Sequence, residues 1–403
     1  MPNVLHIHGT FLPPSERWAA RLVAHTRGFD HYAVARHRVA GLEDTPLAEY
    51  LPHGLEVAAR RVRDPRVPRA TRLVARARLA AAGGLTAAMG RAVGRALPGG
   101  VDIVHAHFAD VAWEHRVLAS KLGAAFVVSF YGWDYEKLPF VRPAFRQNLP
   151  RLFALADAVV AEGPYAAAKL RELGCPGAKT RVVPLGTDLP PITTSPPPRG
   201  SAVPTVLQLA GFAEKKGQLV TLSAFERVAR ELPDARLLLV GGDRDADYSA
   251  RVRRAVADHP AGARIEVREF VRPEALAGVF AEASVFCQPS QYAADRDCEG
   301  GAPVALLDAQ AAGLPCVGTT HCDLPYVIAP LSWNAAVDPG DAAALATRLI
   351  AGLRRDASEV DADTGSVRRH VAEHFDVADC GLRLAELYAS LLRSRTAANR
   401  ASQ

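Results

Sequence analysis

The sequence contains no stretch that approaches the roughly 20 consecutive apolar residues of a membrane-spanning helix. Its first residues, MPNVLHIHGT, lack the charged lead of a secretory signal and run directly into a strand-like segment. The six cysteines form no CxxC pair, which favours buried reduced thiols over disulfides or a zinc site. We therefore expect a cytoplasmic protein. The cysteines are Cys175, Cys287, Cys298, Cys316, Cys322 and Cys380.

Lysine is also scarce, because 42 of the 48 basic residues are arginine and only 6 are lysine. The net charge of +5 is too small to indicate a nucleic-acid binder built on overall charge, so no nucleic-acid partner is expected. In a chain so poor in lysine, the adjacent Lys215 and Lys216 are candidates for a binding or catalytic role.

The length of 403 residues suits two domains of about 150 to 200 residues each, and 49% hydrophobic residues allow each to form a core. Short β-branched runs alternate with helical patterns, which predicts an α/β fold with two doubly wound, Rossmann-like parallel sheets. The predicted strands cover residues 4–8, 101–107, 125–130, 158–162 and 181–184 in the first half, and 205–209, 236–241, 264–270, 284–288 and 316–319 in the second.

The proline-rich segment 188–204 reads as a linker between a domain of residues 1–187 and a second domain of residues 205–376. A final helix over 377–395 is expected to pack back on the first domain. Because open α/β sheets bind ligands at the carboxyl ends of their strands, two facing sheets predict an interdomain cleft as the ligand site.

The segment 287–315 combines acids, glycines and a predicted helix. Pro303 suits the first position of a ten-residue helix, and Gly313 suits its C-cap. Gly300 and Gly301 leave the amides of its first turn accessible to an anion. Carboxylates at Glu299 and Asp308 could accept hydrogens from sugar hydroxyls. A capped surface helix after a glycine turn is an equally weighted alternative.

This segment resembles the donor-binding signature of family 4 of the retaining glycosyltransferases, which have the GT-B fold. The resemblance implies that Glu299 contacts the donor sugar and that Asp308 contacts the ribose. Two departures stand out: the gap between the acids is one residue longer than usual, and the second acid is aspartate instead of glutamate.

A second block, residues 209–217, resembles the family's diphosphate-binding loop. Ala210 and Gly211 stand where relatives usually have a glycine and an arginine, so the arginine is absent. The resemblance then makes Lys216 the main cation on the leaving diphosphate, assisted by Lys215. A solvated helix start is the alternative for this lysine pair. Further donor contacts are implied for Gly211, Gly241, Val271, Gly300, Gly301, Ala302, Leu306 and Leu307.

The first domain matches the family less closely. His107 ends a predicted strand and is assigned a catalytic position by the resemblance, with strand-end packing as the alternative. Tyr131 stands where many relatives have a histidine close to the donor sugar. The residues implied on the acceptor side are Ser15, Glu16, Tyr131 and Asp134.

The resemblance implies transfer of a sugar from a nucleoside diphosphate, most often UDP, to an acceptor hydroxyl with retention and without metal. The product would belong to polysaccharide, glycolipid or secondary-metabolite synthesis. Lys216 and the helix amides would stabilise the leaving diphosphate. An epimerase of the same fold and a two-domain binding protein without catalysis are the alternatives.

Residues 57–95 contain ten arginines and a single acid, Asp64. Arg69, Arg72 and Arg76 fall at helical spacing, which predicts a basic helix face. Such a face could contact an anionic membrane surface or steer an acidic acceptor. A solvated helix in an arginine-rich protein explains the pattern as well.

Overall fold

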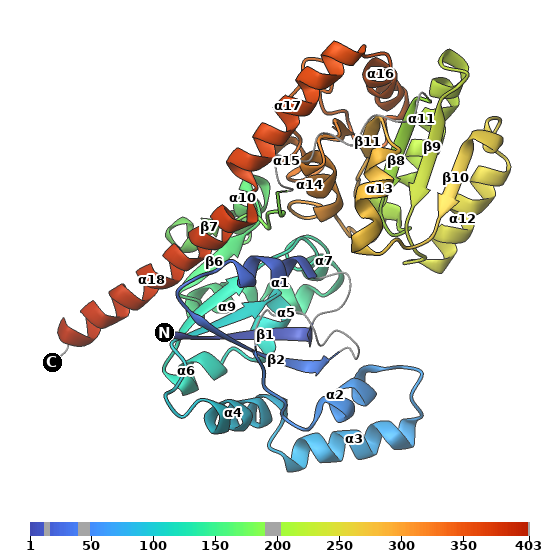
Figure 1. Ribbon diagram of the computed structural model, residues 1–403. Coiled ribbons are helices and arrows are strands. Elements are labelled where there is room, and N and C mark those ends of the chain that lie inside the picture. Colours follow the sequence, from blue (N-terminus) through green and yellow to red (C-terminus); the bar gives the residue numbers. More distant parts are fainter. Residues whose placement is uncertain (12–16, 39–48, 190–202, 402–403) are drawn as a thin grey trace. The chain divides into compact units, whose positions relative to one another are not determined.

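The computed structural model describes residues 1–11, 17–38, 49–189 and 203–401, which divide into two units (Figure 1). Unit 1 comprises Met1–Glu162, Ala167–Leu185 and Val377–Gln403, and unit 2 comprises Gly163–Ala166 and Gly186–Asp376. Each unit contains one parallel β-sheet with helices on its faces, so the predicted α/β fold class is confirmed.

Unit 1 has a seven-stranded sheet in the order β3-β2-β1-β4-β5-β6-β7. Five of its strands were predicted within a few residues, whereas β2 and β3 were missed. The sequence of β2, DHYAVARHR, mixes alanine with charged and histidine residues and so lacks the β-branched run used to find strands. The strands are β1 (Asn3–Phe11), β2 (Asp30–Arg38), β3 (Glu49–Tyr50), β4 (Ile103–His107), β5 (Ala125–Ser129), β6 (Ala158–Ala161) and β7 (Thr180–Val182).

Unit 2 has a five-stranded sheet in the order β10-β9-β8-β11-β12, and all five strands were predicted. Because β8 pairs with both β9 and β11, the strand order reverses at β8, where open α/β sheets bind ligands. Hydrophobic clusters cover both faces of the sheet. The strands are β8 (Thr205–Leu209), β9 (Arg236–Val240), β10 (Ile265–Arg268), β11 (Val285–Gln288) and β12 (Cys316–Gly318).

Helices follow most strands and cover the sheets. The first part of the chain contains α1 (Arg17–Ala24), α2 (Glu56–Arg63), α3 (Arg69–Ala81), α4 (Leu85–Ala96), α5 (Ala109–Glu114), α6 (Leu118–Leu122), α7 (Lys137–Val141), α8 (Pro143–Arg146), α9 (Leu149–Leu155) and α10 (Pro164–Glu172). The second part contains α11 (Gln218–Glu231), α12 (Ala246–Ala257), α13 (Leu276–Ala281), α14 (Val304–Ala311), α15 (Leu324–Val327), α16 (Ala342–Leu353), α17 (Ala357–His374) and α18 (Val377–Ala401).

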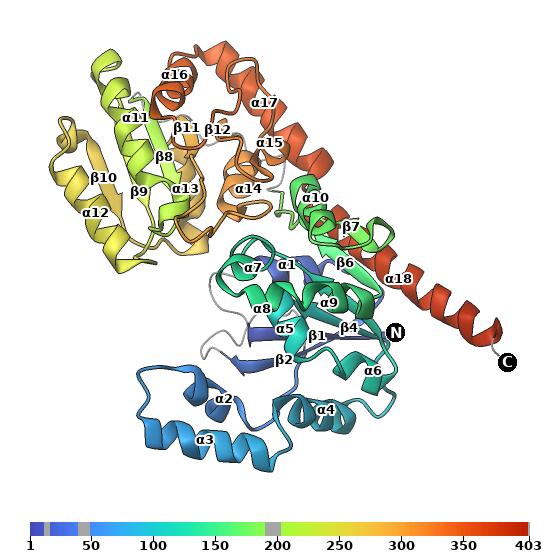
Figure 2. The same cartoon turned by 180° about the vertical axis from the view of Figure 1, so that it is seen from behind.

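The last helix, α18, belongs to unit 1 although it follows unit 2 in the sequence (Figure 2). Its Cys380, Leu384 and Tyr388 are buried in one cluster with Val127 of β5. Gly381 passes so close to His25, the residue after α1, that a Cβ atom there would lie 2.4 Å from the His25 carbonyl oxygen. The helix extends to Ala401, beyond the predicted end at residue 395.

Helix α3 lies outside α2, away from the sheet of unit 1 (Figures 1 and 2). Only Ala75 of this helix is buried, and Leu73 and Val74 are both more than 60% exposed. Across the part of the chain that the structure describes, no helix is long and apolar enough to cross a membrane. All six cysteines are buried thiols, as predicted.

Candidate active site

Lys216 is held at the carboxyl end of β8 by a short helical turn, residues 214–216. The turn ends at Gly217, whose φ of +69° is costly for other residues. A Cβ atom at Gly217 would also lie 2.3 Å from the Pro289 carbonyl oxygen, so only glycine lets this turn approach the loop after β11. The side-chain amide of Gln208 stabilises this turn by donating a hydrogen bond to the Lys216 carbonyl oxygen at 2.6 Å.

The Lys216 ammonium forms an ion pair with the Glu299 carboxylate, which comes from the loop between β11 and α14. The two side chains are only 15% and 5% exposed. The Ser290 hydroxyl donates to Glu299 Oε2 at 3.3 Å, and the Glu299 amide donates to His321 Nε2 at 3.2 Å. Two residues predicted to be catalytic are therefore brought into direct contact and fixed by groups that follow β11 and β12.

The charges of this pair depend on each other. Burial lowers the pKa of Lys216, and the nearby Glu299 carboxylate opposes that shift. For Glu299, burial alone would raise the pKa, but Lys216 and Lys215 outweigh it and hold the pKa below its usual value. Each group therefore favours the charged form of the other, in a setting where water screens them little.

Lys215 points to the same loop but contacts different atoms. Its ammonium donates to the Cys298 carbonyl oxygen at 2.7 Å and to Asp297 Oδ1 at 3.1 Å. These contacts tie the turn after β8 to the residue before Glu299. Lys215 thus holds this loop in place in the structure. Its contact with a donor stays a prediction.

Helix α14 is shorter than expected, with eight residues instead of ten. Pro303 is its N-cap instead of its first helical residue, because Pro303 has an extended ψ of 120°. The amides of Leu306 and Leu307 already donate to the Pro303 carbonyl oxygen, so donor contacts through these two amides are not supported. The amides of Val304 and Ala305 precede them in the first turn, where intrahelical acceptors are lacking.

Asp308 is half-buried on α14 and accepts a hydrogen bond from the Thr187 hydroxyl. Thr187 is itself fixed, because its amide donates to the Phe375 carbonyl oxygen at 2.8 Å. Asp308 therefore joins α14 to the chain just before the linker. Its predicted contact with a ribose is not tested by these contacts.

The glycines predicted to bind a donor have distinct geometries. A Cβ atom at Gly241 would lie 2.0 Å from the Ala210 carbonyl oxygen, so the close approach of two strand ends explains this residue. At Gly211 a Cβ would meet Arg244 at 3.5 Å. Gly300 has a φ of +79°, which permits the turn into α14. Gly301 and Ala302 are buried beside it, and Val271 packs against the core of unit 2.

Arg244 and His321 were not found by sequence reasoning. Arg244 lies beside Gly211. Burial and the charge of Lys215 lower the pKa of Lys216, and the charge of Arg244 adds a smaller effect in the same direction. His321 is buried, and its Nδ1 atom has no hydrogen-bond partner among the described residues. Both residues follow the carboxyl ends of strands, a position that could have singled them out.

In unit 1, His107 and Tyr131 are in contact at the carboxyl ends of β4 and β5. The Tyr131 hydroxyl lies 2.6 Å from His107 Nδ1. Asp134 is fully buried and accepts from the amides of Tyr131 and Ala109 at 2.8 and 3.0 Å. Asp134 therefore shapes the turn that carries Tyr131. Ser15 and Glu16 lie outside the described residues.

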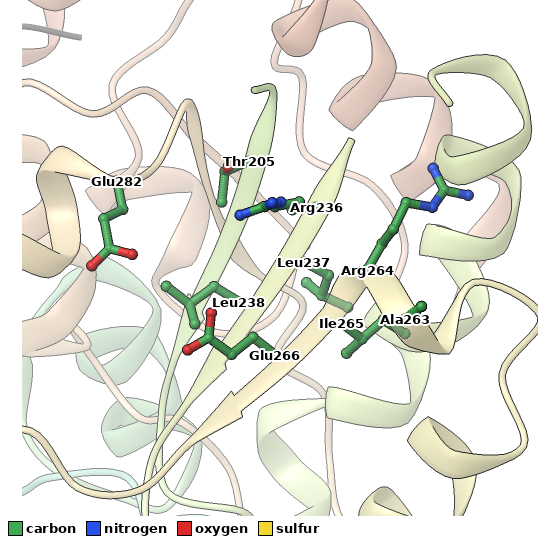
Figure 3. A pocket seen from close by; sticks show the side chains of 9 residues that line it. All are labelled: Thr205, Arg236, Leu237, Leu238, Ala263, Arg264, Ile265, Glu266 and Glu282. Carbon is green, nitrogen blue, oxygen red and sulfur yellow. The ribbon is translucent and has the colours of Figure 1, made fainter. Parts of the chain in front are cut away.

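A hollow of about 410 Å³ occurs elsewhere in unit 2, at the amino ends of β8, β9 and β10 (Figure 3). Arg236, Glu266 and Glu282 are among its lining residues. Lys216 and Glu299 follow the carboxyl ends of β8 and β11, at the opposite edge of the same sheet. This hollow is therefore separate from the candidate active site.

The sequence and the fold match those of known proteins. The model of Glycosyltransferase Family 4 matches residues 24–190, and the model of group 1 glycosyl transferases matches residues 203–355. A protein of Escherichia coli named as a colanic acid biosynthesis glycosyltransferase, WcaL, is 28% identical over 305 residues, which are 73% of this chain and 72% of that protein. A GDP-mannose-dependent alpha-(1-6)-phosphatidylinositol monomannoside mannosyltransferase of Mycolicibacterium smegmatis is 27% identical over 296 residues, which are 70% of this chain and 74% of that protein.

Among solved structures, Anabaena HepE in complex with UDP-glucose superimposes with a TM-score of 0.73 at 15% identity, over 97% of this chain and 100% of that one. This likeness, with one parallel sheet in each of the two units, shows the GT-B fold. The two family models together span most of the sequence. The chain belongs to glycosyltransferase family 4.

Proposed function

We propose that this glycosyltransferase moves a sugar from a nucleoside diphosphate to an acceptor hydroxyl with retention of the anomeric configuration. The buried ion pair of Lys216 and Glu299 is the observation that carries the proposal. A glycosidic bond to a diphosphate breaks with negative charge on the phosphate and positive character on the sugar. A cation and an anion side by side match both charges, and preorganised charge of this kind is often the largest catalytic contribution.

In this proposal Lys216 binds the diphosphate, together with the first-turn amides of α14, and Glu299 orients the sugar. Ser290 and His321 hold the Glu299 carboxylate and amide in place. No metal is assigned a role, because the cationic side chains and amides supply the charge stabilisation.

UDP is the proposed nucleotide, with GDP as the alternative. The UDP-glucose complex of Anabaena HepE supports the first, and the GDP-mannose-dependent mannosyltransferase supports the second. The names of the relatives support an acceptor in exopolysaccharide or glycolipid synthesis. A lipid-linked acceptor also fits the exposed basic helix face of α3.

Incubation with UDP-glucose and with GDP-mannose tests the reaction class. Slow release of the nucleoside diphosphate, accompanied by free sugar that NMR first detects as the α-anomer, supports retaining transfer. Conversion to another nucleotide sugar would support an epimerase, and saturable binding without either product would support a binding protein. The Glu299→Gln variant controls for a contaminating hydrolase, because it should release neither nucleotide.

A further inference from the structure

Unit 1 contains a row of histidines on one face of its sheet. The register pairs His6 of β1 with His105 of β4, and Val4 of β1 with His31 of β2. Since alternate residues of a strand share a face, His107 lies on this face too. The fold thus gathers side chains from three strands that are far apart in the sequence.

These side chains form a continuous chain of hydrogen bonds. From the carboxyl edge of the sheet inward, the Tyr131 hydroxyl lies 2.6 Å from His107 Nδ1. His107 Nε2 lies 3.0 Å from His6 Nδ1, and His6 Nε2 lies 3.0 Å from His31 Nδ1. The chain ends at the Thr26 carbonyl oxygen, 2.8 Å from His31 Nε2.

The end of the chain determines the position of every hydrogen. A carbonyl oxygen only accepts, so His31 must donate from Nε2 to Thr26. A neutral imidazole has one hydrogen, so His31 Nδ1 then accepts from His6 Nε2. The same step repeats at His6 and at His107, whose Nδ1 must accept from the Tyr131 hydroxyl.

This assignment of hydrogens requires neutral imidazole rings, and the three histidines meet that requirement. Burial lowers the pKa of His6 and of His107 well below the ordinary value, and their histidine neighbours lower it further. Burial also lowers the pKa of His31. Burial raises the pKa of Tyr131 well above its usual value, so its hydroxyl keeps its hydrogen.

We infer that the chain from Thr26 through His31, His6 and His107 fixes Tyr131 as a hydrogen-bond acceptor toward the ligand. Because the Tyr131 hydrogen is committed to His107, its oxygen has only lone pairs left for its second partner, the Ser129 side chain, and for a bound molecule. It therefore selects a ligand hydroxyl and cannot donate to a phosphate or carboxylate oxygen. His6 and His31 act through other residues and are positioning residues.

The binding of a ligand hydroxyl at Tyr131 rests on the proposed function. The hydrogen-bond chain itself does not rest on it. A metal ion is the competing use of these rings, because nitrogen atoms of His6, His105 and His107 lie within 4.8 Å of one another. Since His6 and His107 share one hydrogen in the chain, that bond and a shared metal exclude each other.

NMR of the full-length protein with ¹⁵N-labelled histidine tests the chain directly. We expect His6, His31 and His107 to carry their hydrogen on Nε2 at neutral pH, before and after treatment with EDTA. His105 is the internal reference, because its partners are the hydroxyls of Ser129 and Tyr388, which can turn either way. A hydrogen on Nδ1 of His107, a charged His107, or spectra that change when EDTA removes a metal would overturn the inference.

Two variants test the direction of control. His31→Leu removes the acceptor of His6, so His107 should become a mixture of tautomers. Tyr131→Phe should leave the His107 tautomer unchanged, because the tautomer is set from the Thr26 end. A His107 tautomer that responds to Tyr131→Phe but not to His31→Leu would contradict the inference.

The ligand role is read from binding and kinetics. Tyr131→Phe should raise the KM for UDP-glucose hydrolysis about three- to tenfold, the effect of one hydrogen bond, and leave the affinity for UDP unchanged. If Tyr131→Phe lowered the affinities for UDP and for UDP-glucose equally, Tyr131 would contact the nucleotide, and its role as an acceptor for a sugar hydroxyl would be refuted. If neither UDP-glucose nor GDP-mannose is hydrolysed, the proposed function fails, whereas the tautomer measurement still decides on the chain.

Discussion

The Lys216 ammonium and the Glu299 carboxylate form a buried ion pair although they lie 83 residues apart in the sequence. The turn after β8 supplies the lysine, and the loop after β11 supplies the glutamate. Because β8 and β11 are neighbours in a parallel sheet, their carboxyl ends bring the two residues to the same edge.

The contributions of Lys216 and Glu299 to the free energy of unfolding should depend strongly on each other. Lys216→Met and Glu299→Gln should each lower the free energy of unfolding by about 3 kcal/mol, because each leaves a buried charge without its partner. The free energy of unfolding of the double variant should fall by clearly less than the sum of the losses in the two single variants. Urea denaturation of all four proteins measures this double-mutant cycle, and additive losses would show that the two groups do not interact in solution.

Turnover should depend on both residues. Lys216→Ala and Glu299→Gln should lower nucleoside diphosphate release from UDP-glucose by about 100- to 1000-fold, as expected when a preorganised charge is removed from an active site. Circular dichroism would verify that the variants fold. Lys121→Ala removes an exposed lysine of unit 1 and should leave turnover unchanged. Unchanged turnover in both active-site variants would refute the assignment.

Asp134 should make the protein less stable as pH rises. Burial raises the pKa of its carboxyl to about 7, against an ordinary value of 3.8, even though two backbone amides favour the charged form. The folded state therefore binds more protons than the unfolded state between these values, and this contribution to stability is lost as pH rises toward 7. We expect the free energy of unfolding of wild type minus that of Asp134→Asn to decrease from about pH 4.5 to about pH 8. A difference that is constant or increases with pH would contradict the raised pKa.

Helix α3 should bind anionic vesicles. Arg69, Arg72 and Arg76 share one face of the helix with the exposed Leu73. Each basic residue near an anionic membrane contributes roughly 1 kcal/mol, so replacing all three arginines by glutamine should weaken binding to phosphatidylglycerol vesicles about a hundredfold. The matched control replaces the exposed arginines of unit 2, Arg230, Arg251 and Arg254. Equal binding by both triple variants in a co-sedimentation assay would exclude a specific role for α3.

The sequence was sufficient for the fold class and for most strands, because β-branched runs such as Thr205–Leu209 are local signals. It was not sufficient for β2, whose alanines become buried only after pairing with β1. Lys216 and Glu299 were singled out because each lies in a block that resembles the family's donor-binding segments, and Lys216 also follows a recognisable strand. Pro303 was placed one position too far into its helix, since the sequence does not show its ψ angle.

Other parts of the site depend on register and loop geometry. The hydrogen bond from the Glu299 amide to His321 depends on the path of two loops that have no regular pattern. The histidine chain depends on the pairing of β1 with β2 and β4, and β2 was not recognised. The sequence places His6, His31 and His107 far apart, so only the sheet shows that they touch.

The account assigns the diphosphate to Lys216 and the sugar to Glu299, and comparison of UDP with UDP-glucose separates the two roles. Calorimetric titration should show that Lys216→Ala weakens both ligands to a similar extent, whereas Glu299→Gln weakens UDP-glucose much more than UDP. GDP and GDP-mannose serve the same comparison if GDP is the preferred nucleotide. Affinities for all of these ligands that stay at the wild-type level in both variants would contradict the account.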